Sequence, residues 1–265
     1  MRENKNKNMR ITFTEEDHKY TADDGTTYTS VSEVVHSLEL KKDWDAIRKK
    51  YAKKHGGTAT EWKDKWELKA KLSTQAGTSL HEELEDELLS KGTFTIDNKE
   101  CTVISTGKKS EAKYSFPLTE LQDNTVYPEL MIYDHTYKVC GQSDLVTIAN
   151  ETIHILDYKT DKAIKRKAFS TDFVDPEKLL SPVSHLDNCN FNVYSLKMSL
   201  YMYMVWKQNT HLKCGNIILI HKEIERDADE VPVLYDGKPK VLKTTEIQLP
   251  FLRKEVKEIL KSYKK

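Results

Sequence analysis

Two strand-forming runs separated by only two residues are the strongest constraint that this sequence places on the fold. The runs are VTIA (146–149) and TIHI (152–155), and between them stand Asn150 and Glu151. A connection this short between β-branched segments predicts an antiparallel hairpin. If these two residues form the whole loop, Asp144 on the first strand lies directly opposite Asp157 on the second.

Such an arrangement brings like charges together. Directly opposed side chains of an antiparallel pair have Cβ atoms about 4.5–5.5 Å apart, where two carboxylates repel each other. Lys159 lies on the same face as Asp157 because side chains alternate along a strand. A divalent cation between the carboxylates would turn repulsion into coordination, and hard oxygen ligands suit Mg²⁺ or Mn²⁺. The alternative is an ordinary surface cluster of Asp144, Asp157 and Lys159 with a simple salt bridge.

The rest of the chain predicts an α/β fold. Strand patterns rich in Val, Ile and Tyr occur at 127–134, 137–148, 152–160 and 215–224. An almost wholly apolar helix at 192–208 follows the first three of these strands, and a C-terminal helix within 250–265 follows the last. Strands followed by covering helices indicate a central mixed β-sheet flanked by helices.

The N-terminal third predicts a different kind of structure. Residues 1–9 are expected to be a disordered tail, and residues 10–75 a hairpin followed by a helical arm. The hairpin pairs ITFT (11–14) with TTYT (26–29), and Ser30 or Ser32 is expected to cap the next helix. The arm is basic and carries four large aromatic residues: Trp44, Tyr51, Trp62 and Trp66. Two roles are open for these aromatic residues. They pack inward, or they stack on nucleic acid while lysines follow its phosphates, and one helical arm can combine both roles.

The segment TQAGTSLHEELEDELLSKG (74–92) predicts a strong helix that stops at Gly92. Leu80, Leu84 and Leu88 recur with helical spacing, and His81 lies on the neighbouring face. Gly77 costs a helix roughly 1 kcal/mol relative to alanine, so we expect it to allow close approach to another backbone.

Composition narrows the possible functions. The 42 basic and 42 acidic residues cancel, so a nucleic-acid surface would have to be a local patch. The four cysteines form no CxxC pair, which argues against zinc and iron–sulfur sites built from close pairs. With neither a signal-like leader nor an apolar span, we expect a cytoplasmic protein without membrane contacts.

Taken in order, several motifs resemble one known superfamily. YPEL, GQSDLV and ILDYKT resemble the signature of the PD-(D/E)XK nucleases, in which an acid ends one strand and D/E-x-K follows on the next. AGTSLHEELE resembles the GxxxH helix of the RecB-type subgroup, which includes the mitochondrial genome maintenance exonuclease and many phage exonucleases. HKYTADDGTTYTSVSEVV (18–35) and NCNFNVYSLKMSLYMYM (188–204) are also similar to segments of these proteins, so the resemblance spans roughly residues 10–210.

The resemblance implies one nuclease domain over residues 10–265, with a restriction-endonuclease-like core at 76–265 and an insertion at 163–190. It implies a Mg²⁺- or Mn²⁺-dependent DNA exonuclease of replication, recombination or end processing, without an iron–sulfur cluster. Its location would be the cytoplasm, that of the host if the chain is phage-encoded. DNA ends, single-stranded or duplex, would be the partner, and a single-strand-binding or annealing protein is a further expected one. The alternatives are a structure-specific endonuclease on the same fold and a non-catalytic DNA-binding module.

The resemblance also assigns site residues. Asp144 and Asp157 would be metal ligands, His81 a further ligand, Lys159 the catalytic lysine, and Glu129 an acid assisting the metal or the water. The residues expected to contact DNA are Ser30, Ser32, Gln142, Lys197 and Tyr201. One departure concerns Lys197, which stands four residues before Tyr201 where the family usually has glutamine. A lysine could still meet a phosphate, as a point charge.

Overall fold

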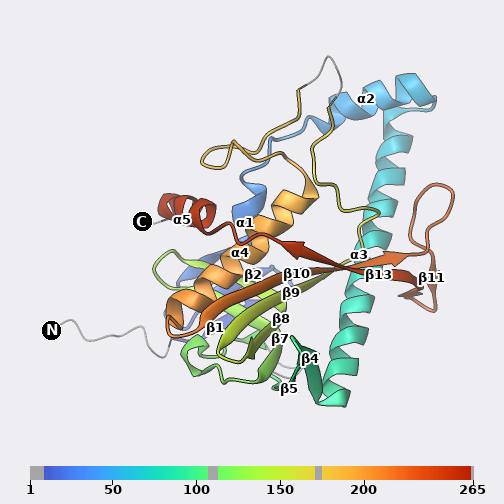
Figure 1. The fold of residues 1–265 in the computed structure, drawn as a ribbon. Helices are drawn as coiled ribbons and strands as arrows, with labels where there is room; N and C mark the ends of the chain where they lie inside the picture. The colour runs from blue at the N-terminus through green and yellow to red at the C-terminus, as the bar shows by residue number, and fades with distance from the viewer. Residues whose placement is uncertain (1–8, 107–112, 171–174, 264–265) are drawn as a thin grey trace.

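A computed structural model describes residues 9–106, 113–170 and 175–263 of the chain. The predicted tail, residues 1–9, lies outside the described residues except for Met9. The described fold is α/β, with an 11-stranded mixed sheet and helices beside it (Figure 1).

The centre of the sheet consists of the predicted strands. They are β7 (Thr125–Asp134), β8 (Val139–Ala149), β9 (Thr152–Lys159), β10 (Lys213–Ile224) and β13 (Val241–Leu249). β7, β8 and β9 are antiparallel neighbours, β10 runs parallel to β9, and β13 closes this edge antiparallel to β10. The sheet is therefore mixed, as predicted.

The predicted two-residue turn is confirmed. Asn150 and Glu151 have φ values of 50° and 57°. This is the left-handed conformation that a type I′ hairpin turn requires at both positions. The register follows from this turn, with Ala149 opposite Thr152 and Leu145 opposite Leu156.

The N-terminal strands form a three-stranded meander rather than the predicted hairpin. Its strands are β1 (Ile11–Thr14), β2 (Lys19–Ala22) and β3 (Thr27–Ser30). The prediction missed β2, although Tyr20 and Ala22 alternate with polar residues and are buried. β3 then pairs in parallel with β8, so the meander is continuous with the main sheet. β1 also pairs with β6 (Lys113–Tyr114).

Shorter strands extend the sheet on another side. β4 (Thr93–Ile96) pairs with β5 (Lys99–Val103), and β5 pairs in parallel with β7. A separate two-stranded ribbon consists of β11 (Leu234–Tyr235) and β12 (Lys238–Pro239). A 3-10 turn, η1 (Leu118–Glu120), precedes β7. In the described residues of the predicted insertion up to Cys189, the backbone is irregular apart from a bridge between Lys178 and Asp187.

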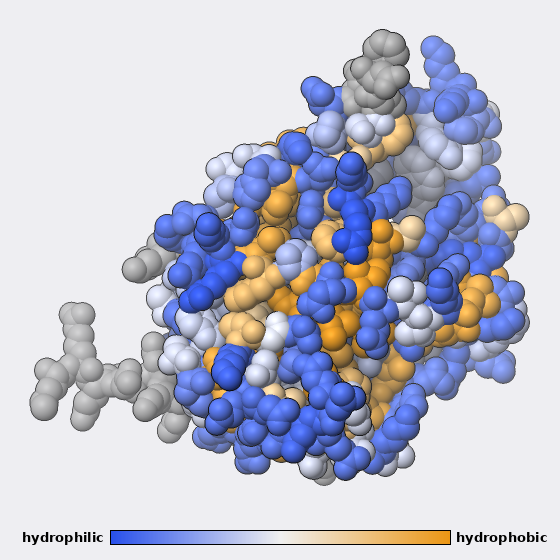
Figure 2. Space-filling view, in the orientation of Figure 1, coloured by the Kyte–Doolittle hydropathy of each residue, from blue (hydrophilic) through white to orange (hydrophobic). Residues whose placement is uncertain are grey.

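Three helices lie together over the sheet: α1 (Val31–His36), α4 (Asn190–Gln208) and α5 (Arg253–Ser262). α4 is the main core helix, and its middle, including Leu196, Met198 and Leu200, is fully buried against the strands. Hydrophobic residues gather towards the middle of the face seen in Figure 2, over α4 and the strands beside it, with hydrophilic residues around them.

α3 (Ala59–Lys91) stands at the side of the sheet as one continuous helix of 33 residues (Figure 1). A capping box at Thr58 begins it and Gly92, in the left-handed conformation, ends it as predicted. The predicted boundary between residues 75 and 76 therefore lies inside α3. Gly77 does not approach another backbone, because the nearest atom to a Cβ placed there is Thr160 Oγ1 at 3.9 Å.

The arm consists of α2 (Trp44–His55) and the first turns of α3. Every residue of α2 is at least partly exposed, so the arm adds little to the core. Its aromatic residues pack on one another instead, with the Tyr51 ring 4.6 Å from Trp62 and 5.4 Å from Trp66. Among the described helices, none is long and apolar enough to cross a bilayer.

Candidate metal centre

Three carboxylates cross three neighbouring strands in one row. On β7, Glu129 stands between the partners of Leu145 and Ser143, and on β9 Asp157 directly follows Leu156, the partner of Leu145. Continuing these registers places both residues beside Asp144. The regular ladder of β8 with β9 ends at Leu145 and Leu156. Directly beyond it, the Tyr158 main-chain N–H donates to Asp144 Oδ2 at 2.7 Å. The carboxylates therefore lie where the two strands begin to separate.

Glu129 adopts a backbone conformation that is rare inside a strand. Its φ is 49°, in the left-handed region. For a residue other than glycine, this conformation costs about 1–3 kcal/mol. The side-chain amide of Gln142 donates to the Glu129 carbonyl at 2.9 Å and so supports it. The sequence left the register of Glu129 open, and the structure places it opposite Asp144. The Gln142 amide is thus bonded to protein backbone beside the carboxylates, and its contact with DNA stays a prediction.

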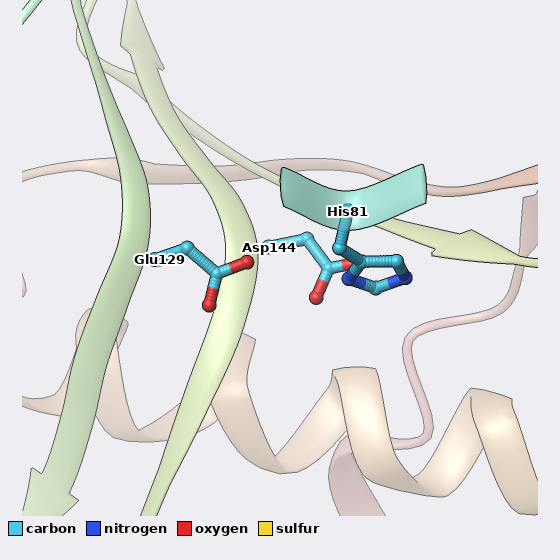
Figure 3. Close-up of side chains that lie close together, drawn as sticks. All are labelled: His81, Glu129 and Asp144. Carbon is cyan, nitrogen blue, oxygen red and sulfur yellow. The ribbon is translucent and has the colours of Figure 1, made fainter. Parts of the chain in front are cut away.

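His81 on α3 reaches this row from outside the sheet. Its Nε2 lies 3.2 Å from the Tyr158 carbonyl oxygen. That oxygen can only accept, so Nε2 carries the proton. The other ring nitrogen, Nδ1, lies 3.4 Å from Asp144 Oδ2. Ligand atoms of His81, Glu129 and Asp144 all lie within 4.8 Å of one another, and the three side chains converge in Figure 3.

This arrangement fits a small divalent cation. A metal-bound histidine commonly donates its other N–H to a carbonyl, as His81 does here. The carboxylates supply the hard oxygen ligands that Mg²⁺ and Mn²⁺ prefer. The three side chains line a pocket of about 10 Å³, roughly the space of one water molecule. The donor set is thus compatible with Mg²⁺ or Mn²⁺ and does not select between them.

Asp157 lies beside the three metal-ligand candidates but faces two lysines. It is 1% exposed, accepts a hydrogen bond from Lys159 Nζ through Oδ2, and has Lys197 Nζ 3.7 Å from Oδ1. In the part of the chain that the structure describes, this buried Oδ1 accepts no hydrogen bond. His81, Asp144 and Asp157 are thus assembled at one place. The ligand atoms that lie within 4.8 Å of one another belong to His81, Glu129 and Asp144, and Asp157 as a metal ligand stays a prediction.

The two neighbouring aspartates have opposite pKa shifts. Burial raises the pKa of Asp144, and the Asp157 charge raises it further. Burial also acts to raise the pKa of Asp157, but Lys159 and then Lys197 outweigh it and hold that pKa below its ordinary value. Asp157 is therefore held as an anion, whereas Asp144 favours a proton or a cation.

Lys197, which stands where the resembled nucleases usually have glutamine, pairs with Asp157 of the candidate site. Burial acts to lower its pKa, but Asp157, Asp144 and Glu129 together raise it. Tyr201 lies one turn further along α4, is 2% exposed, and packs against Gly141 of β8. Its buried position does not offer the DNA contact that the resemblance implies, and its ring lies 5.9 Å from Lys197 Nζ.

Ser30 and Ser32 stand at the start of α1. Ser30 is the N-cap, and its hydroxyl accepts the Glu33 N–H at 3.0 Å. In return, the Glu33 carboxylate accepts the Ser30 N–H at 2.8 Å, which completes a capping box. The Ser30 hydroxyl thus has the capping role, the alternative to phosphate binding. Ser32 is half-buried in the first turn, and its contact with DNA stays a prediction.

The main chain of Tyr158 joins the site together, and sequence reasoning missed it. Its carbonyl accepts from His81 and from Lys159 Nζ at 2.9 Å, and its N–H donates to Asp144. Backbone groups carry no residue signal, so a motif could not reveal this role. Tyr194 was also missed, although it lies three residues before Lys197 on the same helix. Its hydroxyl donates to Asp161 at 2.7 Å, and Lys159 Nζ lies 5.5 Å from its ring centre.

Comparisons with known proteins add little to this geometry. No protein-family model matches the chain, and no curated protein does. Among solved structures, the chain is similar to one described as "Crystal structure of SSO0001", with a TM-score of 0.28 and 14% sequence identity. The alignment covers 88% of this chain and 82% of that chain. A similarity of this size carries no argument about fold or function, so the chemistry of the site rests on its own geometry.

Proposed function

We propose that this protein is a metal-dependent nuclease that hydrolyses phosphodiester bonds in DNA, on a core of the restriction-endonuclease type. The observation that carries the proposal is the row of Glu129, Asp144 and Asp157 on neighbouring strands, with His81 beside Asp144 and Lys159 beside Asp157. Carboxylates gathered at a largely buried place repel one another, so their convergence favours a bound cation. DNA as the substrate comes from the resemblance of the motifs.

Each side chain has a role in this proposal. His81, Glu129 and Asp144 would hold Mg²⁺ or Mn²⁺, which when bound polarises a phosphate and activates water. Hydrolysis joins the water oxygen to phosphorus and breaks one P–O ester bond, so negative charge grows on the phosphate oxygens. Lys159 is placed to stabilise that charge, since an ammonium has three donors and Asp157 and Tyr158 use two. Asp157 is the residue that holds Lys159 in position.

The finer parts of the proposal rest on the resemblance. The resemblance alone supports three of them: exonuclease action, a cytoplasmic location, and a single-strand-binding or annealing protein as partner. A structure-specific endonuclease and a non-catalytic DNA-binding module are the competing functions, and both are separable by experiment.

The test is a time course on end-labelled single-stranded and duplex DNA, with Mg²⁺, Mn²⁺ or EDTA, alongside a circular substrate. We expect cleavage only with metal, and an exonuclease leaves the circle intact. Asp144→Asn should lose at least about 100-fold in rate while keeping its fold by circular dichroism. Asp17→Asn, which changes an exposed carboxylate outside the site, should cleave like the wild type.

Three results would count against the proposal. Cleavage of the circle with metal would favour an endonuclease. DNA binding without any cleavage would favour the non-catalytic module. Undiminished metal-dependent cleavage by Asp144→Asn would overturn the assignment of this site.

A further inference from the structure

A groove of about 430 Å³ opens beside the metal centre. His81 and Tyr158 line both the groove and the small pocket between the metal-ligand candidates, so the two spaces meet at these residues. One wall is α3, and the other is formed by the chain that follows β9 and by Arg226, just after β10. A molecule lying in the groove would have one end at the candidate centre.

The groove is basic at the end away from His81. Lys69 lines it from α3, Lys162 from the segment after β9, and Arg226 from the segment after β10. Lys69 precedes His81 by three steps of four residues, a rise of about 18 Å along the helix. The chain as a whole has no net charge, so this is a local gathering of cations, as a nucleic-acid surface requires.

These cations converge on a single acidic residue, Glu230. Lys162 Nζ donates to one of its carboxylate oxygens, and Lys69 Nζ lies 3.7 Å from the other. Arg226 donates through Nη1 to the Glu230 carbonyl at 3.2 Å and through Nη2 to the Thr160 carbonyl at 2.7 Å. Three cations from three separate segments thus surround one acidic residue.

The loop that carries Glu230 is built to present it. Glu230 has a φ of 63°, and Asp227 accepts N–H groups from both Asp229 and Val231 at 2.9 Å. The carboxylate remains half-exposed, at 48%, while the Lys162 side chain is 65% exposed. Lys162 and then Lys69 hold the pKa of Glu230 below its ordinary value, so the carboxylate is charged.

We propose that this groove binds the sugar-phosphate backbone of the strand being cut, and that Glu230 occupies the position of a phosphate until nucleic acid displaces it. A carboxylate and a phosphate accept the same charge-assisted hydrogen bonds from lysine and arginine. Exposed ion pairs are weak, so a phosphate can replace the carboxylate at low cost. The inference rests on the proposed nuclease function and adds where the strand lies and what competes with it.

The test measures binding without metal, so it does not depend on cleavage. A fluorescent single-stranded oligonucleotide is titrated with protein in EDTA and followed by anisotropy. Glu230→Gln removes the competing charge and should tighten binding about two- to fivefold, the range of one exposed ion pair. Lys162→Ala should weaken binding and lower the slope of log K against log salt by about one.

A matched control is available on the same helix. Glu83 on α3 forms an exposed ion pair with Lys238 at 3.4 Å, and its side chain is also 48% exposed, but it lies outside the groove lining. Glu83→Gln and Lys238→Ala change the net charge equally and should leave affinity within about 1.5-fold of the wild type.

The two proposals fail in different ways. Equal affinities of Glu230→Gln and Glu83→Gln would overturn the groove assignment, even if the wild type cleaves DNA with metal. Tighter binding by Glu230→Gln alone, with no cleavage by the wild type under any metal, would support the groove and overturn the nuclease.

Discussion

Nδ1 of His81 lies 3.4 Å from Oδ2 of Asp144 and faces that carboxylate. Nε2 faces the Tyr158 carbonyl, so a neutral imidazole has its single N–H there and presents the lone pair of Nδ1 to the carboxylate. Two acceptors at this separation repel each other unless a proton or a cation lies between them. Glu129 brings a further anionic oxygen to the same point, which makes a divalent cation the better fit.

Metal binding should depend on this contact. We expect His81→Ala and Asp144→Asn each to weaken Mn²⁺ binding at least about tenfold, because each removes a ligand from a site of three. Isothermal titration calorimetry of metal-stripped protein measures this directly. His211→Ala, at an exposed histidine, should bind like the wild type. Unchanged affinity in both site variants would place the metal elsewhere.

Lys197 should stabilise the fold while weakening metal binding. Lys197→Met leaves the buried Asp157 with Lys159 as its remaining ion-pair partner among the described residues. The expected cost is about 1–3 kcal/mol in unfolding free energy. The change also removes a cation beside the site, so Mn²⁺ affinity should rise by at least about threefold.

The control for this prediction is Lys207→Met on the same helix. Lys207 pairs with the buried Asp134 at 2.6 Å, so its loss should also destabilise the protein. Urea denaturation measures the change in unfolding free energy for both variants. It lies outside the metal site and should leave Mn²⁺ affinity unchanged. A parallel rise in both variants would mean that Lys197 acts only through general charge.

Because Glu129 has a φ of 49°, glycine and alanine at this position should differ in their effect on stability but not in their effect on metal binding. Replacing it with glycine or alanine removes the same ligand, and only glycine adopts this conformation without strain. We therefore expect Glu129→Gly to be more stable than Glu129→Ala by about 1 kcal/mol, with equally weakened metal binding. Thermal and urea unfolding compare the two, and an alanine variant that is as stable as the glycine one would contradict strain at this position.

Two glycines should respond oppositely to the same change. A Cβ at Gly141 would lie 2.8 Å from Tyr201 Oη and 3.0 Å from Val31 Cβ, and the tyrosine is only 2% exposed. Gly141→Ala should therefore cost about 1–3 kcal/mol. A Cβ at Gly77, inside α3, meets only Thr160 Oγ1 at 3.9 Å. Gly77→Ala should therefore be neutral or stabilising by up to about 1 kcal/mol. Urea denaturation of the pair checks this, and destabilisation by both would show that Gly77 has a tight neighbour.

Acid should destabilise the protein through His154. This side chain is 2% exposed, and burial lowers its pKa despite the Asp97 charge nearby. Below the ordinary histidine pKa of about 6.5, the unfolded chain takes up a proton that the native His154 does not. Unfolding free energy therefore falls as pH drops from about 6.5, by at most about 1.4 kcal/mol per pH unit for one proton.

His154→Asn removes the group that takes up this proton. The side-chain oxygen of the new asparagine can accept the Asn216 N–H, which donates to His154 Nδ1 at 3.2 Å in the wild type. Its unfolding free energy should fall less than that of the wild type when the pH is lowered through about 6.5. His211→Asn, at an exposed histidine, should follow the wild-type pH profile in the same urea titrations. An equal pH slope for His154→Asn and the wild type would contradict the prediction.

Much of the site could be read from local patterns. The two-residue spacing between β8 and β9 predicted the turn, and the turn determined the register that sets Asp144 beside Asp157. Helical spacing and the Gly92 stop predicted the helix that carries His81. These features depend on short stretches of backbone, in which geometry follows directly from residue order.

Other features depended on segments that are distant in the chain. Lys197 and Asp157 are 40 residues apart and meet because α4 packs across the sheet. Glu129 reached Asp144 through a turn whose register the residues did not specify. β2 was missed because its short polar-looking sequence is buried only by the strands on either side of it.

By itself, then, the sequence determined the α/β class, the β8–β9 hairpin and the presence of acids, a histidine and lysines suited to metal chemistry. Only the tertiary structure decided which of these side chains lie close enough to share a metal ion. It brought Glu129 to the centre, turned Asp157 toward Lys159 and Lys197, and set Glu230 among the cations of the groove. The physical reason is that hairpin register is a local property of the backbone, whereas the pairing of charges depends on which elements pack together.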